Sequence, residues 1–449
     1  MPEQTALPSE IVASFRPILV REIELTQPLP GLNLTCDGVV YDSAYLVVLI
    51  AHQPVAACTV DCTSEASTLL PAQVADAIWE AAQSDINAWL SNNGLPSVDA
   101  LPVTGLTLPH PPKIVAELAA LESQSPHITI TVCTKDRTDW LKTSIPTLLA
   151  QNYPNFDVVV IDNNPSTSAT EDYLQTIYGD DPRIRYVREP SPRLSIARNR
   201  GIAEARGEII AMSDDDVRVA PNWLLNIAHA FQKYPHVACV TGSVFPGEIE
   251  TPAQLWFEQF LGGFNRGFVP RVYDLKENRP DRPFFFPYLP GIFGTGANMS
   301  FRADAVRKVG GFSPYLGPGS PSDTGEDLDL FFRVVDAGYG LAYVPGAYLY
   351  HYHRREFDAL VRQIETYGRG SMARLTKWFI EKPTRLPGFL LKLPYIPYVL
   401  LFSPSTDNLR RRKYQATIPP QLKQAERRGM LRGPFAYIQS LLTPLPTAR

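Results

Sequence analysis

Apolar and polar positions follow two different periods along residues 127–212. Short apolar runs typical of buried strands recur at four places, and the stretches between two pairs of them have helical spacing. The expected strands are 127–133, 157–161, 183–187 and 209–212, and the expected helices are 139–151 and 195–205. This βαβαβαβ order predicts an α/β fold with a mostly parallel sheet and helices on both faces.

A different pattern precedes this region. Strand-like runs at 18–25 and 45–60, the second folded back near His52, are followed by an amphipathic helix at 71–90 that stops before Gly94. A stretch containing Pro and Ser then leads to residue 126. We therefore expect a small accessory α+β domain at 1–98, a linker at 99–126, the main α/β domain at 127–370 and a C-terminal arm at 371–449.

The C-terminal part allows two interpretations. A helix is expected at 357–378, and an apolar stretch at 386–404 is interrupted by Pro387, Pro394 and Pro397. Its uncharged part, 393–406, is shorter than the roughly 20 residues that a spanning helix needs, and the basic cluster 410–413 follows it. Either the arm packs on the main domain, or it makes a peripheral, salt-sensitive contact with an anionic membrane surface.

Carboxylates stand directly after two of the expected strands. Asp214, Asp215 and Asp216 follow the fourth strand, and Asp162 ends the second. Because ligands bind beyond the carboxyl ends of parallel strands, both groups are expected at one rim of the sheet. A solvated acidic loop explains the triplet equally well when it is taken alone. A bound Mg²⁺ or Mn²⁺ would relieve the repulsion between the carboxylates and leave sites for phosphate, which suits a nucleotide.

Composition narrows the class of protein. The chain has 449 residues, a net charge of −4 and 45% hydrophobic residues, which allows two or three domains with sizeable cores and gives no general affinity for nucleic acid. The five cysteines are scattered and odd in number, and no basic start precedes an apolar core at the N-terminus. A cytoplasmic protein is expected, with the inner face of the membrane as its site of any peripheral contact.

Six motifs in order resemble those of inverting family 2 glycosyltransferases with the GT-A fold. They are VCTKDR at 132–137, VIDNN at 160–164, SIARNRG at 195–201, DDD at 214–216, GTGANMS at 294–300 and GEDLDL at 325–330. The resemblance covers roughly residues 127–370. It implies transfer of a sugar from a nucleotide-sugar donor to the hydroxyl of a saccharide, a lipid-linked or another acceptor.

The resemblance also implies roles on the donor side. The triplet corresponds to the DxD motif, so that Asp214 faces the ribose and Asp216 the metal, while Asp214 also lies near the metal and Asp215 borders the donor. Asp162 would accept a hydrogen bond from the base or ribose, and Thr134 would line the same pocket.

Further residues divide between phosphate, acceptor and metal. Arg198 either pairs with phosphate or is an ordinary surface cation. Asp327 matches the family's general base, with Glu326 beside it as an acceptor-binding residue, although both also suit the first turn of a helix. His351 and His353 share one face of an expected strand. His351 better matches a family position near the metal, and packing against the neighbouring tyrosines is the alternative for both.

Two other classes of function compete with glycosyl transfer. A nucleotidyltransferase would share the sheet but normally carries a glycine-rich loop after its first strand, where this chain has Cys133 to Arg137 without glycine. A non-catalytic nucleotide-binding scaffold is opposed by the intact triplet and by Asp327. The sequence does not identify the donor sugar, its base, the acceptor or the oligomeric state.

Overall fold

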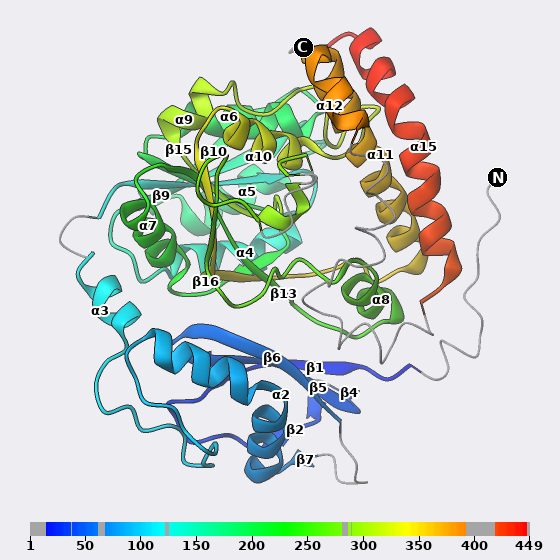
Figure 1. Cartoon of the computed structure of the whole chain (residues 1–449). Helices are drawn as coiled ribbons and strands as arrows, with labels where there is room; N and C mark the ends of the chain where they lie inside the picture. Colours follow the sequence, from blue (N-terminus) through cyan, green and yellow to red (C-terminus); the bar gives the residue numbers. More distant parts are fainter. Residues whose placement is uncertain are drawn as a thin grey trace.

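In the computed structural model of Figure 1, a large α/β part lies above a small N-terminal part, and long C-terminal helices pack along one side. The structure describes residues 15–36, 38–61, 68–121, 125–280, 286–288, 290–391 and 418–446. The central element of the described chain is a nine-stranded sheet with the order β10-β9-β8-β11-β15-β13-β16-β12, in which β14 also pairs with β16.

The first four strands of this sheet are parallel, as the apolar runs predicted. They are β8 (Ile128–Thr134), β9 (Phe156–Asn163), β10 (Ile184–Glu189) and β11 (Ile209–Ser213). The helices that connect them are α4 (Thr138–Leu149), α5 (Ala169–Tyr178) and α6 (Leu194–Glu204). The expected helices 139–151 and 195–205 are thus present, and α5 is the connecting helix that the βαβαβαβ order implies but that no helical spacing located in the sequence.

The second half of the sheet mixes parallel and antiparallel pairs. It contains β12 (Val217–Val219), β13 (Val237–Pro246), β14 (Arg271–Tyr273), β15 (Asn298–Arg302) and β16 (Gly340–His351). Strand β15 runs antiparallel to both β11 and β13, β16 is parallel to β13, and β12 and β14 are antiparallel to β16. The predicted α/β fold is confirmed, with its purely parallel arrangement limited to the first four strands.

Helices cover both faces of the sheet, and the alternation of strand side chains divides the core between them. In β11, Ile209 and Ala211 belong to the cluster under α4, α5 and α7 (Trp223–Lys233), whereas Ile210 and Met212 belong to the opposite one. That second cluster is covered by α6, α9 (Ala303–Lys308) and α10 (Glu326–Asp336). Burial on both faces explains why β11 reads as a continuous apolar run.

The N-terminal part forms its own three-stranded sheet against one helix. Strand β1 (Ile18–Glu24) pairs in parallel with β5 (Ser43–Ile50), and β5 forms a hairpin with β6 (Gln53–Asp61). The turn at His52 has positive φ, and α2 (Pro71–Asn92) packs on this sheet through its apolar stripe. Short pairs complete the unit: β2 (Leu32–Asn33) with β7 (Thr68–Leu69), and β3 (Thr35–Cys36) with β4 (Val39–Val40). Helix α3 (Lys113–Ala119) lies between the two parts.

The N-terminal sheet packs against the part of the main sheet that contains β13 and β16. Tyr348 and Tyr350 of β16 donate hydrogen bonds to Glu22 of β1, with O–O distances of 3.2 and 2.8 Å. Ile18 forms an isolated bridge with Ile249, and these residues share one buried apolar cluster. The two parts therefore meet through hydrogen bonds to a carboxylate inside an apolar contact.

The C-terminal helices form a closely packed pair. Helix α11 (Phe357–Glu381) runs through residue 370 without a break and is followed by the short turn η4 (Pro383–Arg385) and α12 (Leu386–Leu390). Helix α15 (Pro420–Leu442) lies along α11 (Figure 1). Two further short elements are α8 (Pro252–Leu261) and η3 (Pro290–Phe293). The apolar stretch 393–406 and the basic cluster 410–413 lie outside the described residues.

None of the helices in the described part of the chain is long and apolar enough to cross a bilayer.

The contact between α11 and α15 depends on glycines, and this gives a stability prediction. A Cβ on Gly429 would lie 1.9 Å from the carbonyl oxygen of Glu365 in α11, so the helices must separate to admit it. We expect Gly429→Ala to lower the free energy of unfolding by about 1–3 kcal/mol, the usual cost of overpacking. Gly388→Ala in α12, where nothing lies within 4 Å of the new Cβ, is the matched control. Equal urea midpoints for both variants would contradict this packing.

Candidate active site

A cavity of about 740 Å³ opens at the carboxyl ends of β8, β9 and β11. Its wall also includes the first turn of α10, the end of β16 and the first half of α11. The aspartate triplet, Thr134, Arg198, Glu326, Asp327 and His351 all line it. Residues separated by more than two hundred positions are therefore brought to the rim at which a ligand was predicted to bind.

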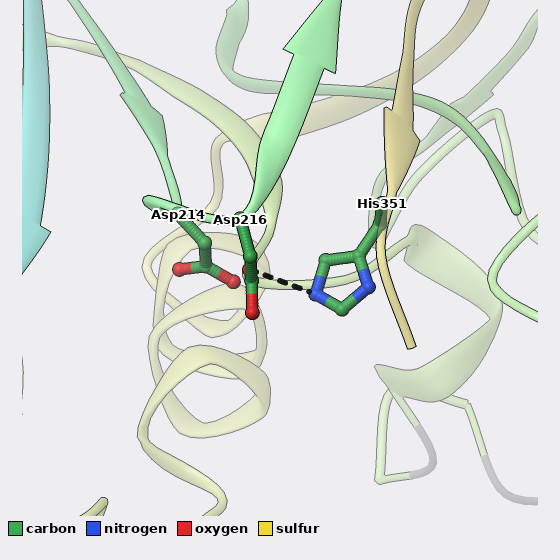
Figure 2. A group of neighbouring side chains, drawn as sticks. All are labelled: Asp214, Asp216 and His351. Carbon is green, nitrogen blue, oxygen red and sulfur yellow. Dashed lines mark ion pairs between the residues drawn. The ribbon is translucent and has the colours of Figure 1, made fainter. Parts of the chain in front are cut away.

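Two members of the triplet and one histidine form a potential metal site. One ligand atom from each of Asp214, Asp216 and His351 lies within 4.8 Å of the others. Figure 2 shows the two carboxylates side by side at the end of β11 and the imidazole of β16 facing them. Register explains the approach, because Val217, which follows Asp216, pairs with His351 in the ladder between β12 and β16. Two carboxylates and an imidazole fit a divalent ion that accepts both oxygen and nitrogen ligands.

Asp216 is the strongly ionised member of the triplet. Burial alone would raise its pKa, but the charge and hydrogen bond of His351, whose Nε2 lies 3.3 Å from Oδ1, hold the pKa well below its ordinary value. Arg137 adds to this effect through a contact of 2.8 Å. A carboxylate that stays ionised is ready to bind a cation without first losing a proton.

Asp215 is turned away from this group. Its two oxygens accept hydrogen bonds from the hydroxyl of Thr134 at 2.7 Å and from Arg137 at 2.5 Å. Burial raises the pKa of Asp215 to about 7, although Arg137 opposes the shift. Asp215 and Thr134 thus support each other across the ends of β8 and β11, while Asp214 and Asp216 face His351.

Arg137 is a site residue that the sequence did not single out. Its guanidinium bridges Asp215 and Asp216 from the loop after β8. Burial opposes its charge, but these carboxylates hold its pKa above the ordinary value. The available signal was its place in VCTKDR, directly after the strand that neighbours the triplet.

Arg198 is buried, so the surface-cation interpretation is wrong. Only 6% of the residue is exposed, and its guanidinium lies between Asp214, at 3.1 Å, and Glu326, at 2.7 Å. Burial would lower the pKa of Arg198, yet Glu326 and Asp214 raise it. The arginine joins the end of β11 to the first turn of α10.

Glu326 and Asp327 have different surroundings on that turn. Glu326 is buried, and its Oε2 has no hydrogen-bond partner among the described residues. Burial raises its pKa from about 4.5 to about 7 despite the charge of Arg198. Asp327 is half-buried, and its carboxylate accepts from the backbone N–H of Gly296 at 2.8 Å and of Leu328 at 2.7 Å. These bonds point its carboxylate along the cavity wall.

Asp162 is separated from the rest of the predicted donor site. Its side chain is buried, Oδ2 accepts a hydrogen bond from the hydroxyl of Tyr186 at 3.1 Å, and Oδ1 has no partner in the described chain. Burial raises its pKa. The cavity wall contains the next residue, Asn163, and not Asp162. Adjacent strand residues face opposite ways, which accounts for the difference.

The two histidines have different neighbours. His351 faces Asp216, and the charge of Asp216 raises its pKa although burial opposes this. His353 is turned to Glu258 of α8, at 2.7 Å, and burial lowers its pKa. Their Nδ1 atoms lie 3.2 Å apart. His351 is therefore the histidine beside the acidic group.

Comparison with known proteins identifies the class. Residues 129–310 match the family described as Glycosyl transferase family 2. The chain is 24% identical over 246 residues to the glucosyl-dolichyl phosphate glucuronosyltransferase of Haloferax volcanii, with 52% of this chain and 72% of that protein covered. It is 29% identical over 238 residues to the succinoglycan biosynthesis protein ExoM of Rhizobium meliloti, covering 51% and 68%.

Two further proteins are similar to this chain. An uncharacterized protein of Sinorhizobium fredii, y4gI, is 26% identical over 271 residues, and the match spans 54% of this chain but only 28% of that protein. Among solved structures, a mannosyltransferase of Pyrobaculum calidifontis in complex with GDP-Man and Mn²⁺ has a TM-score of 0.42 and 16% identity, covering 72% and 87%.

Residues 129–310, about two fifths of the chain, resemble glycosyltransferase family 2. The family predicted from the six motifs and the class of enzyme are thereby confirmed.

The buried carboxyl of Glu326 predicts a specific pH dependence of stability. Its pKa is raised in the folded chain, so between about pH 4.5 and 7 the folded state holds more protons than the unfolded state, and stability falls as the pH rises. Glu326→Gln removes this loss, so the variant should gain stability relative to the parent across that window. Denaturation at several pH values measures the difference, and Asp99→Asn, at an exposed carboxylate, is the control. A constant difference between Glu326→Gln and parent would contradict the burial argument.

Proposed function

We propose that the protein transfers a sugar from a nucleotide-sugar donor to an acceptor hydroxyl, with inversion and with the help of Mg²⁺ or Mn²⁺. The observation that carries this proposal is that the group formed by Asp214, Asp216 and His351 lines the same cavity as Asp327. One cavity thus offers a place for a metal-bound diphosphate and a carboxylate for the attacking hydroxyl.

On the donor side, Asp214, Asp216 and His351 would hold the cation. When bound, a divalent ion neutralises the donor diphosphate and stabilises the departing nucleoside diphosphate. Asp215 keeps Thr134 and Arg137 in place at the cavity wall, and Arg137 and Arg198 supply positive charge beside the phosphates. Asn163, which lines the cavity, would contact the base or ribose, and Asp162 is buried behind it.

On the acceptor side, Asp327 would take the proton of the hydroxyl as its oxygen attacks the anomeric carbon. The new C–O bond forms as the bond to the diphosphate oxygen breaks, and the leaving group departs with the electron pair. Direct attack from the opposite face inverts the anomeric centre and requires no enzyme nucleophile. Glu326 supports this turn through Arg198, which links Glu326 to Asp214.

The relatives suggest the class of acceptor. The names of the Haloferax and Rhizobium proteins refer to a dolichyl-phosphate-linked sugar and to succinoglycan, respectively. We infer that the acceptor here is a saccharide hydroxyl, on a free or lipid-linked glycan, and that the reaction takes place on the cytoplasmic side. Of the two competing classes, the nucleotidyltransferase is not supported by the family match, and the scaffold is tested by turnover.

A panel of nucleotide sugars identifies the donor. Thermal unfolding is followed with each donor, with and without Mn²⁺, because a ligand at a hundredfold its dissociation constant adds about 2.7 kcal/mol of stability. Asp216→Asn should abolish the Mn²⁺-dependent shift. Release of nucleoside diphosphate on addition of saccharide acceptors then distinguishes an enzyme from a scaffold that only binds.

The base assignment predicts a separation between turnover and donor binding. Asp327→Asn keeps the size and can still accept the backbone hydrogen bonds, but it takes no proton at neutral pH. We expect turnover to fall by about 10²–10⁴-fold, the usual contribution of a positioned base, while the affinity for the nucleoside diphosphate with Mn²⁺ stays unchanged. Steady-state kinetics and calorimetric titration measure the two quantities.

Glu326→Gln is the matched comparison and should cost less turnover. If Asp327→Asn turns over normally while Glu326→Gln is inactive, the two carboxylates have exchanged roles. If neither substitution affects turnover, the base lies elsewhere on the cavity wall.

A further inference from the structure

Helix α15 is apolar on two opposite sides. The side that packs on α11 consists largely of small residues, Ala425, Gly429, Gly433, Ala436 and Ser440, and it is buried. The outer side carries Leu431, Phe435, Ile438 and Leu442, of which Leu431, Phe435 and Leu442 are more than three-quarters exposed. Their spacing of four, three and four residues places them on one stripe along the helix.

Positive charge precedes this outer stripe on the same helix. Lys423, Arg427, Arg428 and Arg432 are exposed, against a single carboxylate, Glu426. Arg428 and Arg432 also contact Glu365 of α11, which leaves the neighbourhood with a net positive charge. From residue 427 to residue 446 the sequence contains no acidic residue. The outer side therefore begins basic and continues as large apolar side chains.

We propose that this outer side of α15 binds the surface of an anionic phospholipid membrane. Leu431, Phe435, Ile438 and Leu442 enter the boundary between headgroups and acyl chains, and the preceding cations meet the lipid phosphates. A second copy of the chain fits less well. Two parallel α15 helices would oppose cation to cation, and two antiparallel helices would bury the cations against leucine and phenylalanine. The surface would bring the enzyme to lipid-linked molecules, independently of the chemistry of the active site.

Vesicle co-sedimentation tests this surface with the full chain. Phosphatidylcholine vesicles that contain phosphatidylglycerol should bind the parent, pure phosphatidylcholine vesicles should bind it weakly, and added salt should release it. Leu431→Gln and Phe435→Gln should each weaken binding by about tenfold, because each removes a large apolar side chain from the interface. Ile177→Gln, at a 58% exposed isoleucine on α5, should change nothing.

Three results would overturn the proposal. One is equal sedimentation with and without the anionic vesicles. Another is a shift of the monomer–dimer equilibrium by Leu431→Gln and Phe435→Gln without any vesicle binding, which would assign the stripe to a second copy. The third is a lower unfolding temperature for both variants, which would show that another part of this chain covers the stripe.

A second observation concerns two side chains behind the potential metal site, the buried His353 and the partly buried Glu258. Nδ1 of His351 lies 3.2 Å from Nδ1 of His353, and Nε2 of His353 lies 2.7 Å from Oε1 of Glu258. The His353 side chain is 1% exposed and that of Glu258 is 17% exposed. We propose that Glu258 and His353 are positioning residues that fix the tautomer of His351. This inference rests on the metal site proposed above.

The direction of each hydrogen bond follows from the Glu258 carboxylate, which is the last acceptor in this series of hydrogen bonds. A carboxylate only accepts, so Nε2 of His353 carries the proton that is donated to Glu258. In neutral His353 the other nitrogen, Nδ1, is then an acceptor, and Nδ1 of His351 must donate to it. The remaining nitrogen of His351, Nε2, lies 3.3 Å from Asp216. When protonated, Nε2 donates to that carboxylate, and a cation bound there would take the place of this proton and meet the Nε2 lone pair. Glu258 thus acts through two imidazoles.

Imidazole nitrogen NMR and Mn²⁺ titration test this arrangement. The chain has seven histidines, so spectra of protein labelled with ¹⁵N-histidine can be assigned by single substitutions. His353 should carry its proton on Nε2 and none on Nδ1. Glu258→Met should weaken Mn²⁺ binding by about 10–100-fold, as other losses of a partner behind a ligand do, and His353→Phe should do the same. Glu258→Gln, whose amide oxygen still accepts, should retain the parent affinity.

The outcomes separate the two proposals. If the parent does not bind Mn²⁺, the metal site itself is wrong. If the parent binds and Glu258→Met binds equally well, or if Nδ1 of His353 is protonated, the positioning role is wrong and the metal site stands.

Discussion

The structure of the site depends on placing five carboxylates, at the end of β11 and the start of α10, in one partly buried cavity whose wall also includes Asp323. The five are Asp214, Asp215, Asp216, Glu326 and Asp327. Burial without compensation would neutralise them, and only two guanidinium groups, those of Arg137 and Arg198, contact members of this set among the described residues. The outcome is an uneven distribution of charge: Asp216 has a strongly lowered pKa, whereas Asp215 and Glu326 have pKa values near 7.

This uneven distribution of charge matches the different roles proposed for the carboxylates. Burial raises the pKa values of Asp215 and Glu326 although each has an arginine beside it, whereas His351 and Arg137 together hold the pKa of Asp216 low. Arg198 connects the two ends of the cavity, because it touches a carboxylate after β11 and another at the start of α10. A change at either end therefore alters the electrostatic field at the other, since buried charges are weakly screened.

The fold was largely predictable because its signals are local. The apolar runs of β8, β9 and β11 and the spacing in α2 report burial directly, and the triplet after β11 marks the rim of the sheet. Antiparallel β15 was not predictable in this way, because its pairing with β11 joins residues about ninety positions apart. Similarly, α5 has a buried side of only two residues, Thr170 and Leu174, which is too short a signal to read.

The sequence predicted which residues belong to the site better than it predicted the contacts between them. Asp214, Asp216 and His351 come together because of the ladder between β12 and β16, which no local pattern reveals. Glu258 carries no signal of its own in the sequence, since a charged helix residue is common, and Arg137 is marked only by its place in VCTKDR. Asp162 shows the opposite case: its strand end was read correctly, but strand alternation turns the neighbouring Asn163 to the cavity.

The hydrogen bonds of Tyr348 and Tyr350 to Glu22 have a consequence for the architecture of the whole chain. These tyrosines lie on β16, the strand that ends at His351, so the N-terminal sheet is hydrogen-bonded to the same strand that places His351 in the cavity. The N-terminal part and the cavity are thus connected through one strand. A different N-terminal unit joined to this sheet would have to supply a new hydrogen-bond acceptor for both phenol groups. In a chimeric protein, the N-terminal unit and the main sheet must therefore come from the same parent.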